Sequence, residues 1–110
     1  MARSKTKRVS SVSPFKVSDY LDSNRLRAEY LAAWLDQPSS DTSDIVRALR
    51  DISHSRGFAT IATKLGMSRK SLERTLGKDG NPTLETFLKV TRACGIRLAA
   101  QSVNRSRERP

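Results

Sequence analysis

Basic side chains are concentrated in a short stretch of the sequence between residues 68 and 74. Arg69, Lys70 and Arg74 lie close together there, beside Ser68 and Ser71. Arginine and lysine side chains can contact phosphate oxygens or the O6 and N7 acceptors of guanine, and serine hydroxyls can donate to phosphate. The stretch therefore indicates a surface that contacts nucleic acid.

Two short helices are predicted to hold this stretch, over residues 58–66 and 69–76. Gly66 lies between them, and glycine enters the left-handed conformation of a tight turn without a Cβ penalty. Leu72 and Leu76 share one face of the second helix and are expected to point to the core. The opposite, exposed face then carries Arg69, Lys70, Glu73 and Arg74.

A pair of short helices joined in this way forms a helix-turn-helix if the helices cross at a steep angle. In such motifs the N-terminal residues of the second helix reach base edges in the major groove of DNA. Ser68 is placed to cap that helix, and Ser68 and Ser71 can bind phosphate together with the backbone N–H groups of the helix start. The alternative is an ordinary αα-hairpin with a solvated charged face. The small Ala62 at the expected helix contact, together with Gly66, favours the helix-turn-helix.

Three further polar residues belong to the candidate surface. Lys78 and Asn81, in the loop that follows, are expected to face the flanking phosphate backbone. Glu73 can accept a hydrogen bond from cytosine or orient a neighbouring basic side chain, and the sequence leaves both roles open. No nucleophile–base arrangement, carboxylate pair or phosphate-cradling glycine loop accompanies them, so we expect no enzymatic activity.

The remaining elements predict an all-α fold with five helices. A short helical turn is expected at 18–21, and longer helices over about 23–37, 42–56 and 84–93, each with a capping residue and an apolar stripe. Residues 96–101 alternate in part with a period of two, which fits a short C-terminal strand that would need a partner chain. The domain is expected to span 15–103, between a disordered basic arm over 1–14 and a basic tail over 104–110.

The apolar stripes predict which side chains form the core. On the helix over about 23–37 and on that over 84–93, the inward positions are Leu26, Tyr30, Leu31, Trp34 and Leu35, and Leu84, Phe87, Leu88, Thr91 and Cys94 respectively. Gly57 fits a left-handed position that ends the helix before it.

The net charge of +10 is unevenly placed along the chain. Residues 18–57 hold five basic and seven acidic side chains, whereas residues 58–103 hold eight basic and three acidic ones. A basic excess inside a segment expected to fold favours phosphate as a partner. The single cysteine, Cys94, excludes an intrachain disulfide, and its apolar surroundings favour an inert buried thiol.

Several classes of protein are not expected from this sequence. The only histidine, His54, has no clustered ligands beside it, so we expect neither a metal site nor a cofactor. No apolar run approaches the ~18 residues that span a membrane. The N-terminus lacks the apolar stretch of a signal peptide, which favours a cytoplasmic location.

The sequence resembles a known family over most of its length. Residues 43–95 look like the lambda-repressor-like (XRE-type) helix-turn-helix domain, and residues 15–102 resemble the putative addiction-module antidote family, which is similar to HigA-type antitoxins. The residues that carry this resemblance are Phe15 with Asp19-Tyr20-Leu21, Tyr30-Leu31, Gly57 with Ile61-Ala62, Leu65-Gly66-Met67-Ser68-Arg69, Ser71-Leu72, Leu76, Gly80-Asn81-Pro82-Thr83, Leu88-Lys89-Val90 and Gly95.

The resemblance implies a function and its partners. It implies an antitoxin that neutralises a small RelE/HigB-type toxin, usually a ribosome-dependent mRNA endonuclease, and that represses its own operon by binding the promoter as a dimer. The positions that would read DNA are Ser68, Arg69, Lys70, Ser71 and Arg74. The sequence departs from related domains at Phe58-Ala59-Thr60, where they often carry a phosphate-binding glutamine, and in its basic arm over 1–14.

The acidic balance of residues 18–57 fits a toxin with a basic, RNA-binding surface. The candidate contacts are Asp19, Asp22, Glu29 and Asp36. Acidic residues also favour helix starts and keep surfaces soluble, so the pattern has this simpler explanation too. Two other functions stay open: a protein-interaction module whose DNA binding is vestigial, and a stand-alone phage-type transcriptional regulator.

Overall fold

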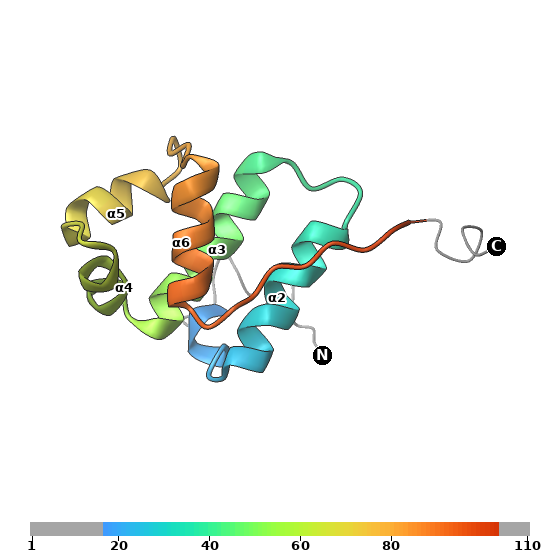
Figure 1. The fold of residues 1–110 in the computed structure, drawn as a ribbon, viewed down its shortest axis with the longest axis horizontal. Coiled ribbons are helices and arrows are strands. Elements are labelled where there is room, and N and C mark those ends of the chain that lie inside the picture. The colour runs from blue at the N-terminus through green and yellow to red at the C-terminus, as the bar shows by residue number, and fades with distance from the viewer. Residues whose placement is uncertain (1–16, 104–110) are drawn as a thin grey trace, which may run out of the picture.

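The computed structural model describes residues 17–103, in which a 3-10 helix precedes five α-helices (Figure 1). These elements are η1 (Val17–Tyr20), α2 (Asn24–Asp36), α3 (Thr42–Arg56), α4 (Phe58–Leu65), α5 (Arg69–Thr75) and α6 (Leu84–Ala93). The prediction of an all-α fold with five helices is therefore confirmed for this part of the chain. The basic arm predicted over 1–14 and the tail over 104–110 lie outside the described residues.

Capping side chains fix where most of these helices begin. Ser23 Oγ accepts a hydrogen bond from the backbone N–H of Leu26 at 3.1 Å, and Thr83 caps α6 in the same way. Asp41 forms a capping box with Asp44, in which each carboxylate accepts from the other residue's backbone N–H. The N–H of Asp44 holds the pKa of the Asp41 carboxyl below its ordinary value. These caps satisfy N–H groups that a helix start leaves without partners.

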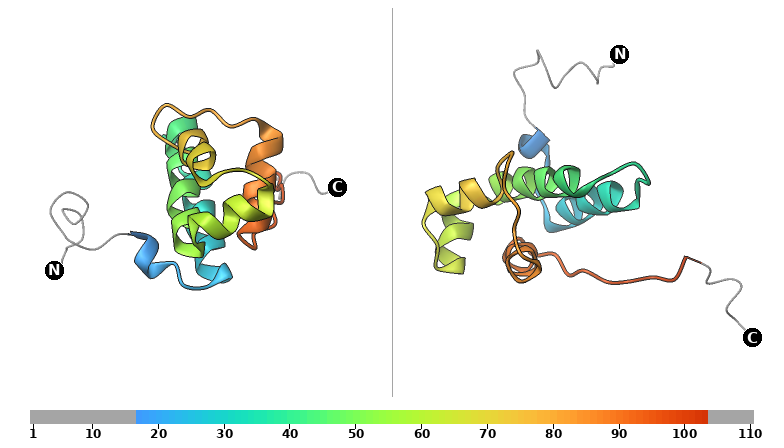
Figure 2. Two further views of the ribbon diagram at one scale, coloured as in Figure 1. Left: turned by 90° about the vertical axis from the view of Figure 1, so that its left-hand side faces the viewer. Right: turned by 90° about the horizontal axis from the view of Figure 1, so that it is seen from above.

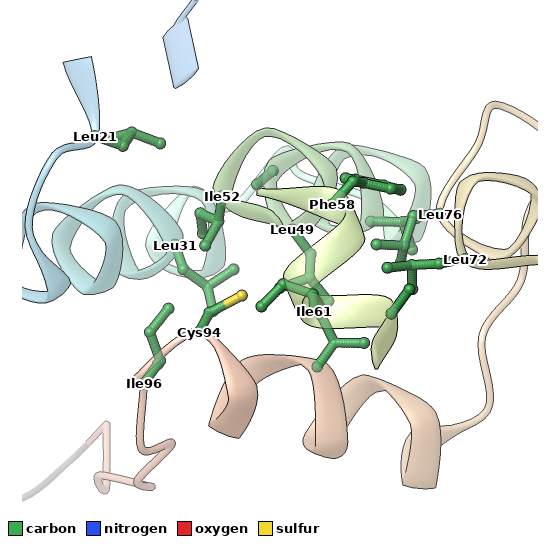
Figure 3. Close-up of a cluster of buried hydrophobic side chains, with 14 residues drawn as sticks. Leu21, Leu31, Leu49, Ile52, Phe58, Ile61, Leu72, Leu76, Cys94 and Ile96 are labelled. Carbon is green, nitrogen blue, oxygen red and sulfur yellow. The ribbon is translucent and has the colours of Figure 1, made fainter. Parts of the chain in front are cut away.

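Helix α3 lies at the centre of the fold and contacts η1, α2, α4 and α6. Its Leu49 and Ile52 are fully buried, and they meet Ile61 of α4, Leu72 of α5 and Cys94 of α6 in one apolar cluster (Figure 3). Seen from above, η1 and α6 lie on opposite sides of the layer formed by α2 and α3 (Figure 2). The α4–α5 pair thus stands at one end of this layer, held by a shared core.

The prediction of a short strand over residues 96–101 is wrong. No strand occurs within residues 17–103; the segment after Ile96 runs extended along α2 (Figure 1). Ile96, Leu98 and Ala99 line a shallow cavity of about 210 Å³ together with residues of α2, including Leu31. The alternating pattern therefore reflects side chains laid on a helix, and no neighbouring strand supplies a hydrogen-bonding edge in the described part of the chain.

Two leucines predicted to face the core are exposed instead. Leu35, in the last turn of α2, is 50% exposed, and Leu84, the first residue of α6, is 71% exposed. Both stand at helix ends; Leu35 lines the shallow cavity beside Leu98 and is covered only in part, and Leu84 is the first residue of its helix. Val90 has no exposed surface and supplies core contacts on α6 that the prediction did not include.

Gly57 has a positive φ but not the predicted left-handed αL conformation. Its φ is 102° and its ψ is 108°. It is both the C-cap residue of α3 and the N-cap residue of α4. The extended ψ redirects the chain into a new helix at once, whereas αL geometry would curl it back over the end of α3.

Candidate nucleic-acid interface

The stretch 58–77, predicted as a helix-turn-helix, contains α4 and α5, joined by the turn at Gly66. Gly66 adopts φ 70° and ψ 28°, the predicted left-handed conformation. Its backbone N–H donates to the carbonyl of Thr63 at 3.1 Å, and the N–H of Met67 donates to that of Ala62 at 2.9 Å. Ala62 is almost wholly buried. The turn therefore ends α4 with its last carbonyl groups paired and places α5 against it.

The inner side of α5 is apolar and its outer side is charged, as predicted. Leu72 and Leu76 have no exposed surface. Ser68 caps the helix, since its Oγ accepts from the backbone N–H of Ser71 at 3.0 Å. The exposed residues of this helix are Arg69, Lys70, Glu73 and Arg74, while Ser71 is half-buried.

Glu73 forms an ion pair with Arg69 across one turn of this outer face. The Nε atom of Arg69 lies 3.1 Å from Oε2 of Glu73, and the two side chains are 62% and 47% exposed. Solvent screens such a pair strongly, so the pair contributes little to stability. It directs the guanidinium group of Arg69 along the helix and leaves that group at the surface. Of the two roles that the sequence left open for Glu73, the structure shows the orientation of a basic neighbour.

The loop after α5 turns back tightly against that helix. The N–H of Gly77 donates to the carbonyl of Arg74 at 3.2 Å, and the N–H of Gly80 to that of Gly77 at 2.9 Å. A Cβ atom on Gly80 would stand 2.0 Å from the carbonyl oxygen of Thr75, so only glycine fits there. Lys78 and Asn81 are exposed on this loop, and their contact with a phosphate backbone stays a prediction.

Two arginines of α3 that the prediction left out also stand near this loop. Arg50 donates from Nη1 to the carbonyl oxygen of Leu76 at 3.0 Å. Arg47 and Arg50 line a cavity of about 360 Å³ together with Lys78. Their spacing along α3 showed only that they lie off its apolar stripe. Nothing local in the sequence indicates that this helix passes the end of α5.

The four acidic residues predicted to contact a toxin do not form one cluster. Asp19 lies in η1 and Asp22 in the link to α2, whereas Asp36 is the last residue of that 13-residue helix. Glu29, midway along α2, pairs with Arg25 at 2.9 Å. All four are exposed. They are therefore spread over η1, the link and the length of α2.

The comparisons with known proteins place the chain in a family. Residues 11–102 match the family model described as "Probable addiction module antidote protein". The chain belongs to this antidote family. It is also 33% identical over 87 residues to an uncharacterized protein of Haemophilus influenzae, a match that covers 79% of this chain and 88% of that protein. No solved structure matches the chain.

Membership of the antidote family implies a toxin partner in general. The resemblance stated from the sequence is confirmed to this extent, because the matched range covers every described helix. None of the helices within residues 17–103 is long and apolar enough to cross a membrane.

Two aromatic residues of α2 pack against α3. Tyr30 donates to Asp51 Oδ2 at 2.7 Å, and Trp34 meets the ring of Tyr30 edge-on at 6.5 Å. Arg47 lies over the Trp34 ring, 5.4 Å from its centre. Burial and the bond to Asp51 raise the pKa of Tyr30 from 10.0 to about 12. These contacts support the interpretation of both aromatics as packing residues of the antidote fold.

The sole cysteine and the sole histidine both pack against other side chains of the antidote fold. Cys94 is fully buried, and burial raises the pKa of its thiol. His54, exposed near the C-terminal end of α3, stacks on the ring of Phe58 with centres 4.3 Å apart. Within residues 17–103 no group of three or more histidine, cysteine, aspartate or glutamate residues is placed to hold a metal ion.

Proposed function

We propose that this chain is the antitoxin of a type II toxin–antitoxin module and represses its own operon. Its partners would be a RelE/HigB-type mRNA-endonuclease toxin and the double-stranded promoter DNA of the operon. The observation that carries the DNA-binding half is the outer face of α5. Leu72 and Leu76 fix that helix to the core, so that Arg69, Lys70 and Arg74 project from it.

In this proposal α4 and α5 act as a lambda-repressor-like (XRE-type) helix-turn-helix of the HigA-like kind, with α5 in the major groove. Arg69, at the N-terminal end of α5, is placed to read guanine, and its ion pair with Glu73 presets its direction. Lys70 and Arg74 contact phosphate on either side. Ser68 and Ser71 add hydroxyl and backbone donors at the helix start. Lys78 and Asn81 extend the contact along the backbone.

Recognition of an operon promoter usually requires two copies of such a domain. One α5 helix spans seven residues and reads few base pairs, and two-fold-related half-sites double the contact. We therefore propose a homodimer in the cytoplasm, without a catalytic activity of its own. The toxin would bind on the half of the molecule formed by η1 and α2, which carries Asp19, Asp22, Glu29 and Asp36.

The DNA-binding half is tested by fluorescence anisotropy with two labelled duplexes of equal length. One is the fragment upstream of the operon, and the other has the same base composition in scrambled order. We expect the promoter fragment to bind at least about 1,000-fold more tightly, the lower end of the usual gap between specific and non-specific binding. Equal affinity for both duplexes would contradict specific repression.

The toxin-binding half is tested by co-expression with the protein encoded beside this chain. We expect a stable complex on gel filtration and relief of growth arrest when both are present. Absence of a small toxin-like neighbour would favour the stand-alone phage-type regulator instead.

One observation favours a second candidate, a protein-interaction module with vestigial DNA binding. Glu73 stands on the outer face of α5 and offsets part of the positive charge there. A tight complex with the neighbouring protein, combined with equal and weak binding of both duplexes, would support this candidate over autorepression.

A further inference from the structure

A basic cavity lies between the N-terminal half of α3 and the loop that follows α5. It has a volume of about 360 Å³ and is lined by Ser43, Val46, Arg47, Arg50, Gly77, Lys78 and Gly80. Three of these residues are cations and none is a carboxylate. The cations come from two segments about 30 residues apart in the sequence, α3 and the loop after α5, whose backbones the fold brings close together (Figures 1 and 2).

The cations of this cavity are held in place by contacts that leave them accessible. Arg50 uses one N–H on the carbonyl of Leu76, and a guanidinium has five N–H donors. Arg47 is 52% exposed and is steadied by the Trp34 ring and by Asp44, 3.6 Å away. Lys78 stands on the loop that Gly80 clamps to α5. Contacts with neighbouring groups therefore position the two arginine side chains, and the clamped loop positions the backbone of Lys78.

The position of the cavity indicates its ligand. It begins directly after α5 ends, since Gly77 follows the capping residue Leu76. A duplex that receives α5 in its major groove must carry a sugar–phosphate strand past that end of the helix. Several converging cationic donors, with the Asp44 carboxylate beside Arg47 but outside the lining, suit a phosphate diester, which shares one negative charge between two non-bridging oxygens.

We propose that this cavity, through Arg47, Arg50 and Lys78, binds a backbone phosphate of the DNA duplex. The site rests on the proposed function and deepens it, because it adds residues of α3, outside the α4–α5 pair, to the contact. Such a contact fixes the register of the protein on the duplex and carries no base information of its own.

The test measures how the binding constant depends on salt for the full chain. Each phosphate contact adds about 0.9 to the slope of log K against log salt concentration, because it releases condensed counterions. Anisotropy titrations over a series of KCl concentrations use both the promoter fragment and the scrambled duplex. The variants are Arg47→Gln and Lys78→Gln, with Arg92→Gln as the matched control, an exposed arginine of α6 outside the cavity. Arg47→Lys tests whether charge alone suffices.

We expect Arg47→Gln and Lys78→Gln each to lower the slope by about 1 on both duplexes, and the double variant by about 2. Arg92→Gln should leave the slope unchanged, and Arg47→Lys should restore most of it. The ratio of the two affinities should not move in any of them. Slopes equal to that of the unaltered chain in both glutamine variants would overturn the proposal, as would a change confined to the promoter fragment.

These outcomes separate the cavity from the proposed function. Equal binding of both duplexes by the unaltered chain, with the expected slope changes, would remove specific repression and keep the phosphate site. Promoter preference without slope changes would do the reverse, and no binding to either duplex would remove both. A titration with inorganic phosphate tests whether the cavity binds free phosphate instead of DNA. The NMR signals of the Gly77 and Gly80 amides report the binding. Saturation by free phosphate at low millimolar concentration without slope changes would overturn the DNA assignment.

Discussion

Arg50 donates a hydrogen bond to the carbonyl oxygen of Leu76 across 3.0 Å, and this contact joins the middle of α3 to the C-terminal end of α5. The donor is cationic and the acceptor belongs to the last turn of a helix, where the helix dipole favours positive charge. The placement of the candidate DNA-binding helix thus depends on a side chain from outside the α4–α5 pair.

Replacement of Arg50 by methionine should destabilise the fold by about 1–3 kcal/mol, because the Leu76 carbonyl loses a charged donor. Methionine keeps the apolar stem of the side chain, so the change reports mainly on the hydrogen bond. Urea unfolding followed by circular dichroism measures it. Arg92→Met, on the exposed side of α6, is the control and should change the free energy of unfolding by less than about 0.5 kcal/mol.

Two glycine-to-alanine variants should differ sharply in their cost. At Gly80 the new Cβ would meet the Thr75 carbonyl at 2.0 Å, so the loop must move, at about 2–4 kcal/mol. At Gly66 no atom lies within 4 Å of the new Cβ, and the cost is that of a left-handed backbone alone, about 1–2 kcal/mol. Thermal unfolding of both variants checks the order, and a larger loss for Gly66→Ala would contradict the structure.

Arg69 and Lys70 should affect DNA binding in different ways if α5 enters the major groove. Arg69→Ala should cost about 1–3 kcal/mol on the promoter fragment and little on the scrambled duplex, because a base contact is lost. Lys70→Glu should weaken binding to both duplexes alike, because it opposes phosphate. The measurement is the ratio of the two affinities for each variant, with Lys89→Glu on α6 as the control. A uniform loss in Arg69→Ala would assign that residue to the backbone.

The stability of the fold should fall in alkaline solution in a way that depends on Tyr30. Its pKa in the folded state is about 12, against an ordinary value of 10.0, because of burial and the bond to Asp51. Above pH 10 the unfolded chain releases this proton first, so the stabilisation is complete below pH 10 and is lost as the pH rises towards 12. Urea midpoints at pH 8 and pH 11 measure the loss.

The phenylalanine variant isolates the contribution of this hydroxyl. Tyr30→Phe should be less stable at pH 8, by about 1–2 kcal/mol for the lost hydrogen bond to a carboxylate, and should lose less between pH 8 and pH 11. Tyr20→Phe, at an exposed tyrosine of η1, is the control. An equal alkaline loss in Tyr30→Phe and the unaltered chain would show that other groups cause it.

Local signals in the sequence predicted the approximate helix boundaries and the exposed basic face of α5. Ser68 and Thr83 cap helices because a hydroxyl needs only the backbone two or three residues ahead. Gly66 turns the chain because its own φ requires it. The spacing of Leu72 and Leu76 identifies the inner face of α5, and so the basic side chains of this helix could be placed on its outer face before the fold was known.

Features that depend on distant contacts escaped prediction. Leu35 and Leu84 fit their helical stripes but stand at helix ends and stay exposed. The alternation after Ile96 has the period of a strand, yet the chain lies on α2 without a strand beside it. Arg47 and Arg50 were not among the predicted site residues, because nothing within α3 indicates that the loop of Lys78 lies next to them.

The extended segment over 97–101 has one further consequence. Within the described part of the chain no hydrogen bond engages its backbone. Its side chains Arg97, Leu98 and Ala99 lie beside α2 in the shallow cavity that the buried Ile96 also lines. Its amide hydrogens should therefore exchange with solvent nearly as fast as those of a free peptide, while the amides of the adjacent α2 stay protected. This end of the domain is ordered in space yet open to any edge that offers it donors and acceptors.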